Sequence, residues 1–359
     1  MKRTLSLLLT AALSLSLLTG CAPKAPAGAS SSTASDISSS AGPSSAGSGQ
    51  PDGPSSSADP GGTDTDDGPR LMVLSGPTGV GAAKLMADKT GVSSVEVVTD
   101  NKQVSDALIN KDVDIAAIAT NAAANLSAKS DGAIQVLAVN TLGVLYILEK
   151  GDSVHSIADL AGKTVYAPSN TRGANPEHIL NHLLANTVMD LAKVNIEWLT
   201  PQEITAKMTS SDSGICMLPV PAATALLVKD SGVREAVSLS EAWEDLEGSP
   251  LPMGCVVART AYVEEHPQEV EEFLAAYEAS ISYINDPANS DGASALVAQY
   301  EFAPNDKVAA KAIPQCSLTF VTGQRMKDML EDYYTILFQA APESIGGGLP
   351  YDSFYYGVS

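Results

Sequence analysis

Residues 159–190 read DLAGKTVYAPSNTRGANPEHILNHLLANTVMD, and this stretch decides the fold class. A short β-prone run (163–167) precedes a loop of turn-forming and small polar residues (168–174). Asn175 suits a helix N-cap, Pro176 suits the first helical position, and apolar residues then recur with helical spacing. A polar loop between the end of a strand and the start of a helix is where open α/β sheets bind ligands.

The same alternation of β-prone and helical segments extends over residues 72–259. It is typical of mostly parallel sheets with helices on both faces, so the sequence predicts an α/β fold. After Arg259 helical patterns dominate, and an aromatic cluster around Phe354 is expected to pin the C-terminus to the core. The expected strands cover residues 71–75, 95–99, 113–119, 134–140, 144–149, 164–167, 194–199, 214–218, 233–239 and 255–259.

The N-terminus carries the features of a secretory signal. A basic start precedes an apolar run from Leu5 to Leu18, which is too short to span a bilayer and is typical of a signal peptide. The run ends in Leu-Thr-Gly-Cys21, which resembles the lipobox of bacterial lipoproteins. The resemblance implies a signal peptide over residues 1–20, cleavage before Cys21 and acylation of its thiol. The alternative is an ordinary secreted protein with an incidental cysteine.

The next segment is polar and of low complexity. Residues 28–68 contain almost only Ser, Gly, Ala, Pro, Thr and Asp, which cannot bury enough apolar surface to offset their conformational entropy. We therefore expect residues 21–69 to be a lipidated, disordered tether on the outer face of the cell membrane. The formal net charge of -21 argues against nucleic-acid binding, and no later apolar run is long enough to cross a membrane. Contact with the membrane is thus expected through the lipid anchor only.

Four stretches carry a resemblance to a known family. They are an entry into a strand at residues 154–165, a proline-flanked element at 218–226, a strand and helix start at 251–267, and the closing residues 342–356. In order and spacing they resemble type 2 periplasmic solute-binding proteins of ABC importers, in the branch for nitrate, sulfonates, taurine and thiamine precursors. One departure is Val220, which stands where many relatives carry Glu between two prolines, so any ligand contact from that carboxylate is absent here.

The resemblance implies two α/β lobes joined by crossing strands, with a ligand cleft between them. Residues 70–150 plus 255–359 are expected to form lobe 1, and residues 151–254 lobe 2. The implied function is a monomeric extracytoplasmic lipoprotein, not an enzyme and without a cofactor. It would capture a small polar organic or anionic solute by lobe closure and deliver it to an ABC permease and its ATPase. A ligand-sensing surface lipoprotein and an enzyme of small-molecule metabolism on the same fold stay open as alternatives.

Loops at the strand ends hold the candidate ligand-binding residues, because small polar side chains and bare backbone amides let a ligand approach closely. Ordinary turn and N-cap chemistry uses the same residue types, so a purely structural role stays open for each. Arg172 is the sharpest case: a guanidinium beside a helix N-terminus can grip a sulfonate or carboxylate, and the alternative is an exposed loop arginine. The candidates are Ser75, Thr78, Thr120, Asn121, Asn140, Thr141, Asn170, Thr171, Arg172, Gly173 and Pro219.

Three other sequence patterns are candidates for a metal site, a disulfide or a structural role. His178 and His182 share a helix face at metal-ligand spacing, but no third ligand stands at a recognisable spacing, so no metal is predicted. Three cysteines remain beyond the lipobox; a bridge between Cys255 and Cys316 is one expectation, and buried unpaired thiols are the other. Residues 200–203 form a capping box with proline at the first helical position, which is a structural signal.

Overall fold

The apolar runs of the sequence form two β-sheets, one in each lobe of a two-lobed α/β fold. The computed structural model describes residues 68–189 and 194–358. The expected signal peptide, Cys21 and nearly all of the tether lie outside these residues. The expected α/β architecture is confirmed, and every strand predicted from the sequence is present within one or two residues of its expected position.

The first sheet has six strands in the order β11-β4-β10-β3-β1-β2. Its central strands are buried along almost their whole length, because helices cover both faces. The strands are β1 (Arg70–Leu74), β2 (Ser94–Val98), β3 (Ile115–Ala119), β4 (Ile134–Thr141), β10 (Gly254–Arg259) and β11 (Leu318–Val321).

The second sheet has five strands in the order β7-β6-β8-β5-β9. It includes β5, which directly follows β4 in the chain but pairs with β8 and β9. The change of sheet therefore falls at residues 142–144, several residues before the lobe boundary expected at residue 150. The strands are β5 (Leu145–Lys150), β6 (Thr164–Pro168), β7 (Asn195–Leu199), β8 (Gly214–Pro219) and β9 (Val233–Ser238).

Four strands of each sheet share one direction, as expected, and β5, β10 and β11 run against them, so both sheets are mixed. Strand β1 is parallel to β2 and β3, and β6 is parallel to β7 and β8. Strand β10 is antiparallel to β3 and β4, β11 is antiparallel to β4, and β5 is antiparallel to β8 and β9. The sequence does not distinguish these strands from the others, because a strand buried on both faces has the same apolar pattern in either direction.

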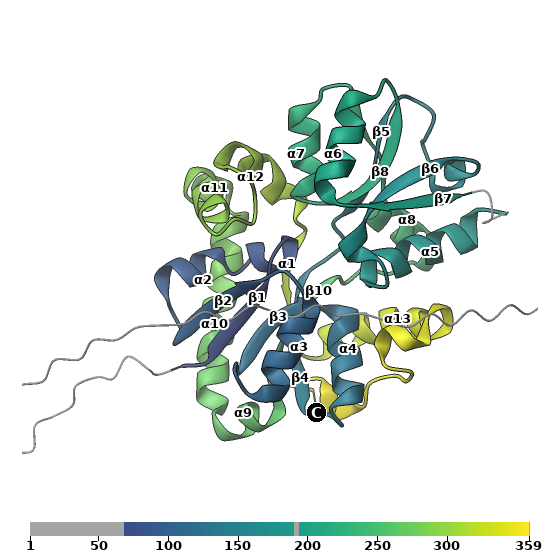
Figure 1. Ribbon diagram of the computed structural model, residues 1–359. Helices are drawn as coiled ribbons and strands as arrows, with labels where there is room; N and C mark the ends of the chain where they lie inside the picture. The colour runs from purple at the N-terminus through teal and green to yellow at the C-terminus, as the bar shows by residue number, and fades with distance from the viewer. Residues whose placement is uncertain (1–67, 190–193, 359) are drawn as a thin grey trace, which may run out of the picture. The chain divides into compact units, whose positions relative to one another are not determined.

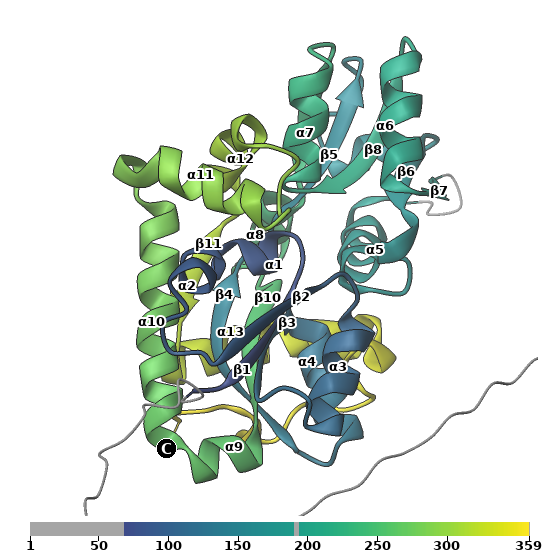
Figure 2. The same ribbon diagram turned by 60° about the vertical axis from the view of Figure 1, so that its left-hand side comes forward.

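Helices cover both faces of each sheet (Figure 1). In the first lobe, α2 and α10 lie on one side and α3 and α4 on the other (Figure 2). In the second lobe, α6 and α7 pack on strands β6, β8 and β9, and α5 packs on α8. The first-lobe helices are α1 (Pro77–Val80), α2 (Ala83–Asp88), α3 (Asn101–Asn110), α4 (Thr120–Lys129), α9 (Thr260–Glu265), α10 (Pro267–Asn285), α11 (Ser290–Gln299), α12 (Asp306–Ala312) and α13 (Gly323–Ala340). The second-lobe helices are α5 (Asn175–Thr187), α6 (Pro201–Ser210), α7 (Ala222–Lys229) and α8 (Leu239–Glu247).

Short 3₁₀ segments complete the described elements. They are η1 (Ile157–Leu160), η2 (Ser169–Thr171), η4 (Pro287–Asn289), η5 (Ile313–Gln315), η6 (Pro342–Ile345) and η7 (Asp352–Phe354). The aromatic tail behaves as expected, since Tyr355 forms a bridge with Val136 of β4 and Phe354 is buried. Among the described residues, no helix combines the length and the apolar character that crossing a membrane requires.

A buried carboxylate joins three strands of the first sheet. Asp114, directly before β3, accepts hydrogen bonds from the backbone N–H and the guanidinium of Arg70 on β1, with its Oδ2 2.9 Å from Arg70 Nε. Its Oδ1 accepts from Arg259 at the end of β10. Burial by itself raises the pKa of Asp114, but the hydrogen bonds from both arginines outweigh this and lower it to about 2. The ionised form therefore stabilises the fold.

We predict that Asp114→Asn lowers the free energy of unfolding by about 2 kcal/mol at pH 7, as a depressed carboxyl pKa requires. The native pKa lies below the unfolded value, so this stability is present above about pH 4 and is lost as the pH falls towards 2. Urea denaturation of both proteins between pH 7 and pH 3 measures it. A difference that stays constant over this range would contradict the assignment.

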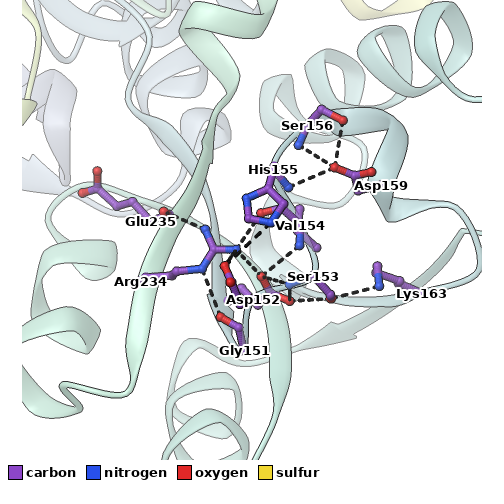
Figure 3. Close-up of polar contacts among 11 residues, drawn as sticks. Gly151, Asp152, Ser153, Val154, His155, Ser156, Asp159, Lys163, Arg234 and Glu235 are labelled. Atoms are coloured by element: carbon purple, nitrogen blue, oxygen red, sulfur yellow. Dashed lines mark hydrogen bonds and ion pairs between the residues drawn. The ribbon is translucent and has the colours of Figure 1, made fainter.

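A second buried carboxylate anchors the entry into the second lobe. Figure 3 shows its surroundings, with Arg234 beside Gly151, Asp152, Ser153 and Val154. Glu149 on β5 accepts from the N–H and hydroxyl of Ser153 and from the N–H of Val154. Arg234 on β9 lies with Nη2 2.6 Å from Glu149 Oε2 and donates from Nε to Gly151 O. Burial alone raises the pKa of Glu149, but these hydrogen bonds and the arginine hold it below its ordinary value. The family-like stretch from Val154 thus begins at a structural anchor.

Arg234 offers a matched pair of tests, because it also lies 3.3 Å from Asp152, whose side chain is 84% exposed. We expect Glu149→Gln to lower the free energy of unfolding by about 3 kcal/mol, since it breaks a buried ion pair and sets an amide N–H₂ against the N–H groups that the buried carboxylate accepts from. Asp152→Asn should change it by less than about 0.5 kcal/mol, as exposed ion pairs do. Chemical denaturation of the two variants measures both values, and equal losses would refute the buried anchor.

Candidate functional site

The carboxyl ends of strands from both sheets surround a cavity of about 330 Å³. The first lobe contributes the ends of β1 and β3 and the start of α1, and the second lobe contributes the ends of β6 and β8 and the starts of α5, α6 and α7. The cavity is lined by Leu74, Ser75, Gly76, Pro77, Thr78, Thr99, Asn101, Ala119, Thr141, Val144, Leu145, Pro168, Asn170, Thr171, Ala174, Asn175, Pro176, Pro201, Leu218, Pro219, Ala222 and Met253. This is the place that the strand–loop–helix stretch predicted for a ligand.

A polar layer behind the first-lobe wall fixes its side chains. Asn140 is fully buried and donates from Nδ2 to the backbone oxygen of Thr78 at 3.1 Å and to the hydroxyl of Tyr277 at 2.9 Å. Its Oδ1 accepts from the hydroxyl of Thr141 at 3.1 Å. Gly254 leaves the space for this layer, since a Cβ there would lie 2.7 Å from Asn140 Oδ1. The cavity wall is therefore held in place before any ligand arrives.

The second-lobe wall is a turn, a proline-rich strand end and a buried amide. The hydroxyl of Thr171 donates to Pro168 O at 2.6 Å, which closes the η2 turn at the cavity. Asn175 is the first residue of α5, not its N-cap as expected; the cap position is Ala174. The hydroxyl of Tyr333 on α13 donates to Asn175 Oδ1, while Asn175 Nδ2 is buried and has no hydrogen-bond partner among the described residues.

The structure brings about half of the predicted site residues to the cavity. These are Ser75, Thr78, Thr141, Asn170, Thr171 and Pro219. The rest of the predicted set lies outside the lining. Ligand contact stays a prediction for both groups. The residues outside the lining are Thr120, Asn121, Asn140, Arg172 and Gly173.

Internal hydrogen bonds explain why several candidates face away. The hydroxyl of Thr120 donates to Pro252 O at 2.8 Å, and Asn121 Nδ2 donates to Ser344 O at 3.4 Å, so both side chains serve packing of the first lobe. Arg172 follows the η2 turn and is exposed, and Gly173 lies on a neighbouring surface groove beside α3 and α4. The arginine takes the position of its structural alternative, an exposed loop residue.

Other lining residues were not singled out from the sequence. Asn101 and Thr99 follow β2, Met253 precedes β10, and Pro176 and Pro201 begin helices of the second lobe. The start of a helix is the sequence feature that could have indicated them, because helix starts face the strand ends in α/β folds. The expected capping box at Thr200 is confirmed. The described residues that line the cavity include no Asp, Glu, Lys, Arg or His and no aromatic ring.

One of the two helix histidines has another partner. His182 Nε2 lies 2.6 Å from Glu247 Oε1, and its ring packs at 5.1 Å from the ring of Trp243. Trp243 in turn packs at 5.7 Å from Tyr333, so this cluster runs from the second lobe to the first. Within residues 68–189 and 194–358, no group of three or more His, Cys, Asp or Glu could hold a metal ion.

The expected bridge between Cys255 and Cys316 was wrong, because both thiols are free and buried, as is Cys216. Cys255 lies on β10 and Cys316 lies directly before β11, and β4 stands between these strands. Two strand spacings amount to roughly 10 Å, which exceeds the Cα separation that a disulfide spans. Burial raises the pKa of the Cys216 and Cys316 thiols to about 12.

Comparisons with known proteins agree with this architecture. The family model described as "Menaquinone biosynthesis" matches residues 84–335. In fold the chain is similar to an ABC transporter protein from Parabacteroides distasonis, with 21% identity and a TM-score of 0.67 over 81% of this chain and 99% of that chain. No protein of curated function matches the sequence.

Two further solved structures are similar. The periplasmic aliphatic sulphonate binding protein SsuA from Escherichia coli has 16% identity and a TM-score of 0.61 over 77% of this chain and 89% of that chain. The ligand binding component of an ABC-type import system from Staphylococcus aureus has 16% identity and a TM-score of 0.59 over 80% of this chain and 95% of that chain. These likenesses confirm the expected periplasmic-binding-protein fold.

The polar layer behind the cavity gives a test of how the wall is held. In Gly254→Ala the new Cβ meets Asn140 Oδ1 and also Thr78 Oγ1 at 3.0 Å, and Asn140 is fixed by Tyr277. We expect a loss of about 1–3 kcal/mol in the free energy of unfolding, as for other overpacked sites. Gly348→Ala, where no atom lies within 4 Å, is the control and should change little. Denaturant titration compares them; a well-tolerated Gly254→Ala would argue against a rigid wall.

Proposed function

Since this chain belongs to the family described as "Menaquinone biosynthesis" and has the periplasmic-binding-protein fold, we propose that it is an extracytoplasmic solute-binding protein of an ABC importer. The observation that carries the proposal is the cavity at the strand ends, which is walled by residues of both lobes. A molecule held there touches both lobes at once, so its binding favours the closed arrangement over the open one.

The contacts between the lobes suit such an equilibrium. Gln315, before β11, accepts from the hydroxyl of Thr224 on α7 at 2.8 Å and donates to Glu235 on β9 at 2.7 Å. Tyr333 and Asn175 make a further hydrogen bond across the lobes. Hydrogen bonds that exchange with water contribute only about 1 kcal/mol each, so a ligand of ordinary affinity can bias their formation.

The place of action follows from the N-terminal sequence. We propose that Cys21 carries the lipid, that residues 21–69 tether the binding domain to the outer face of the cell membrane, and that the closed form docks on an ABC permease. Membrane attachment keeps the binding protein at high local concentration beside the permease, which favours their encounter.

The second candidate function is an enzyme of small-molecule metabolism, which the description of the matched family favours. The lining of the cavity favours binding without chemistry. General acid–base or nucleophilic catalysis requires a titratable or activated side chain at the reacting atoms. No such pair is found among the described residues that line the cavity. A surface sensor would bind its ligand as a transport protein does, and differs only in that its deletion leaves uptake unchanged.

The test uses the full chain, equilibrated with a small-molecule extract of bacterial cells and then washed. We expect one compound to be retained at about one molecule per chain, to be released unchanged on denaturation, and to decrease the radius of gyration measured by X-ray scattering. Ala222→Trp, which fills the cavity, should retain none. A chemically altered product would favour the enzyme, and no retained compound would contradict a binding function at this cavity.

A further inference from the structure

The cavity has an unusual electrostatic character for a site expected to take an anion. Its described lining consists of aliphatic, proline, hydroxyl and amide side chains, without a charged group. Transfer of an ionised group from water into such surroundings costs several kcal/mol unless an opposite charge or several hydrogen bonds compensate it. Arg172, the cation that the sequence offered for this purpose, is exposed and lies outside the lining.

Two of the helix starts at the cavity, those of α5 and α6, do not replace that charge. In α5, Pro176 has no N–H, and the N–H groups of Glu177 and His178 both donate to Ala174 O. The carboxylate of Glu177 accepts from the N–H of Gly173, which places a negative charge at the end of the helix where an anion would gain from the dipole.

The start of α6 follows the same pattern. Pro201 has no N–H, and the N–H of Glu203 donates to the hydroxyl of Thr200 at 3.2 Å. The carboxylate of Glu203 closes the capping box, with Oε2 2.8 Å from the N–H of Thr200. At these two helix starts, donors that would otherwise serve an anion are thus absent or already used, and each of the two carries its own carboxylate. The starts of α1 and α7, which also line the cavity, have no acidic residue in the first turn and no side-chain cap, so any gain for an anion there comes from backbone N–H groups alone.

One buried donor is left for a ligand. Asn175 is 3% exposed and lines the cavity, and its Oδ1 is engaged by Tyr333. Its Nδ2 has no partner among the described residues. A buried amide donor without a partner costs about 1–3 kcal/mol, so an acceptor atom placed beside it gains that energy on binding. A neutral carbonyl or sulfonyl oxygen supplies the acceptor without the cost of burying a charge.

We propose that this cavity selects an uncharged organic molecule with an apolar body and a hydrogen-bond acceptor that binds Asn175 Nδ2. This inference rests on the proposed binding function and names the class of its ligand. Aliphatic and proline side chains of both lobes pack against the body, and the hydroxyls of Thr78, Thr141 and Thr171 lie around it. Stacking of a flat ring is not part of the recognition, because the described lining holds no aromatic side chain.

The test compares probes with the same carbon skeleton and different charge. Hexanamide and hexanoate form one pair, and butane-1-sulfonamide and butane-1-sulfonate form another. Each is added to the full chain, and the melting temperature and affinity are measured, since a ligand of the native state raises the former. We expect the neutral member of each pair to bind at least tenfold more tightly. Tighter binding of hexanoate or the sulfonate would overturn the inference and leave the binding function intact.

The compound retained from the cell extract decides the case independently of these probes. Its charge at neutral pH should be zero. A retained anion or cation would overturn the inference about ligand class, whereas retention of nothing, together with no response to any probe, would overturn the proposed function itself. The two failures are therefore distinguishable.

Asn175→Asp tests the donor. The variant keeps the acceptor for Tyr333 but exchanges the free N–H₂ for a carboxylate oxygen, so we expect at least a tenfold loss of affinity for the retained compound. Arg172→Ala is the control and should bind within twofold of the parent protein. Circular dichroism and denaturation verify folding, and Tyr333→Phe, which leaves the amide but releases its orientation, should weaken binding less. Undiminished affinity in a folded Asn175→Asp would refute the donor role.

Discussion

Backbone pairing of β10 between β3 and β4 is the constraint on which the rest of the structure depends. The chain returns from the second lobe at residues 248–253 and enters the middle of the first sheet, where every peptide group must find a partner. Both neighbours of β10 are fixed by this antiparallel register, and one of them, β4, ends where the chain first left the lobe, at residues 142–144. The two lobe crossings therefore lie side by side, with Met253 N–H donating to Thr141 O at 2.9 Å. Arg259 locks the far end of the strand through Asp114.

The same insertion places the cavity. Because β10 begins at the crossing, its first residue packs against Asn140 and Thr78 at the edge of the ligand space. Buried polar groups there are satisfied by one another, so few remain to face a ligand. Asn175 is the exception, since Tyr333 engages only one end of its amide. A site with one buried, unpartnered donor and no charged side chain in its described lining selects its ligand by shape and by a hydrogen-bond acceptor rather than by charge.

The sequence predicted the strands well because each is a short apolar run between turn formers, and it missed β11 because Leu318–Val321 is only four residues long. It could not give strand direction, since a strand buried on both faces has no directional pattern. For the site, it located the strand-end loops but not which of their side chains face inward. Arg172 and Thr171 are adjacent polar residues, and only the structure shows that the threonine, whose hydroxyl closes the η2 turn, lines the cavity while the arginine is exposed.

The helix caps affect which class of ligand the helix starts at the cavity can attract. Proline and glutamate in the first turn are strong helix-start signals because they suit missing N–H partners and the helix dipole. In the same positions, proline lacks an N–H donor, and the carboxylate of glutamate offsets the positive potential of the helix start, so both weaken the attraction of an anion. Around this cavity, the starts of α5 and α6 both use that combination. A helix N-terminus at a strand end therefore indicates an anion site only when its own cap leaves the first-turn N–H groups free, and here Glu177 and Glu203 occupy that position themselves.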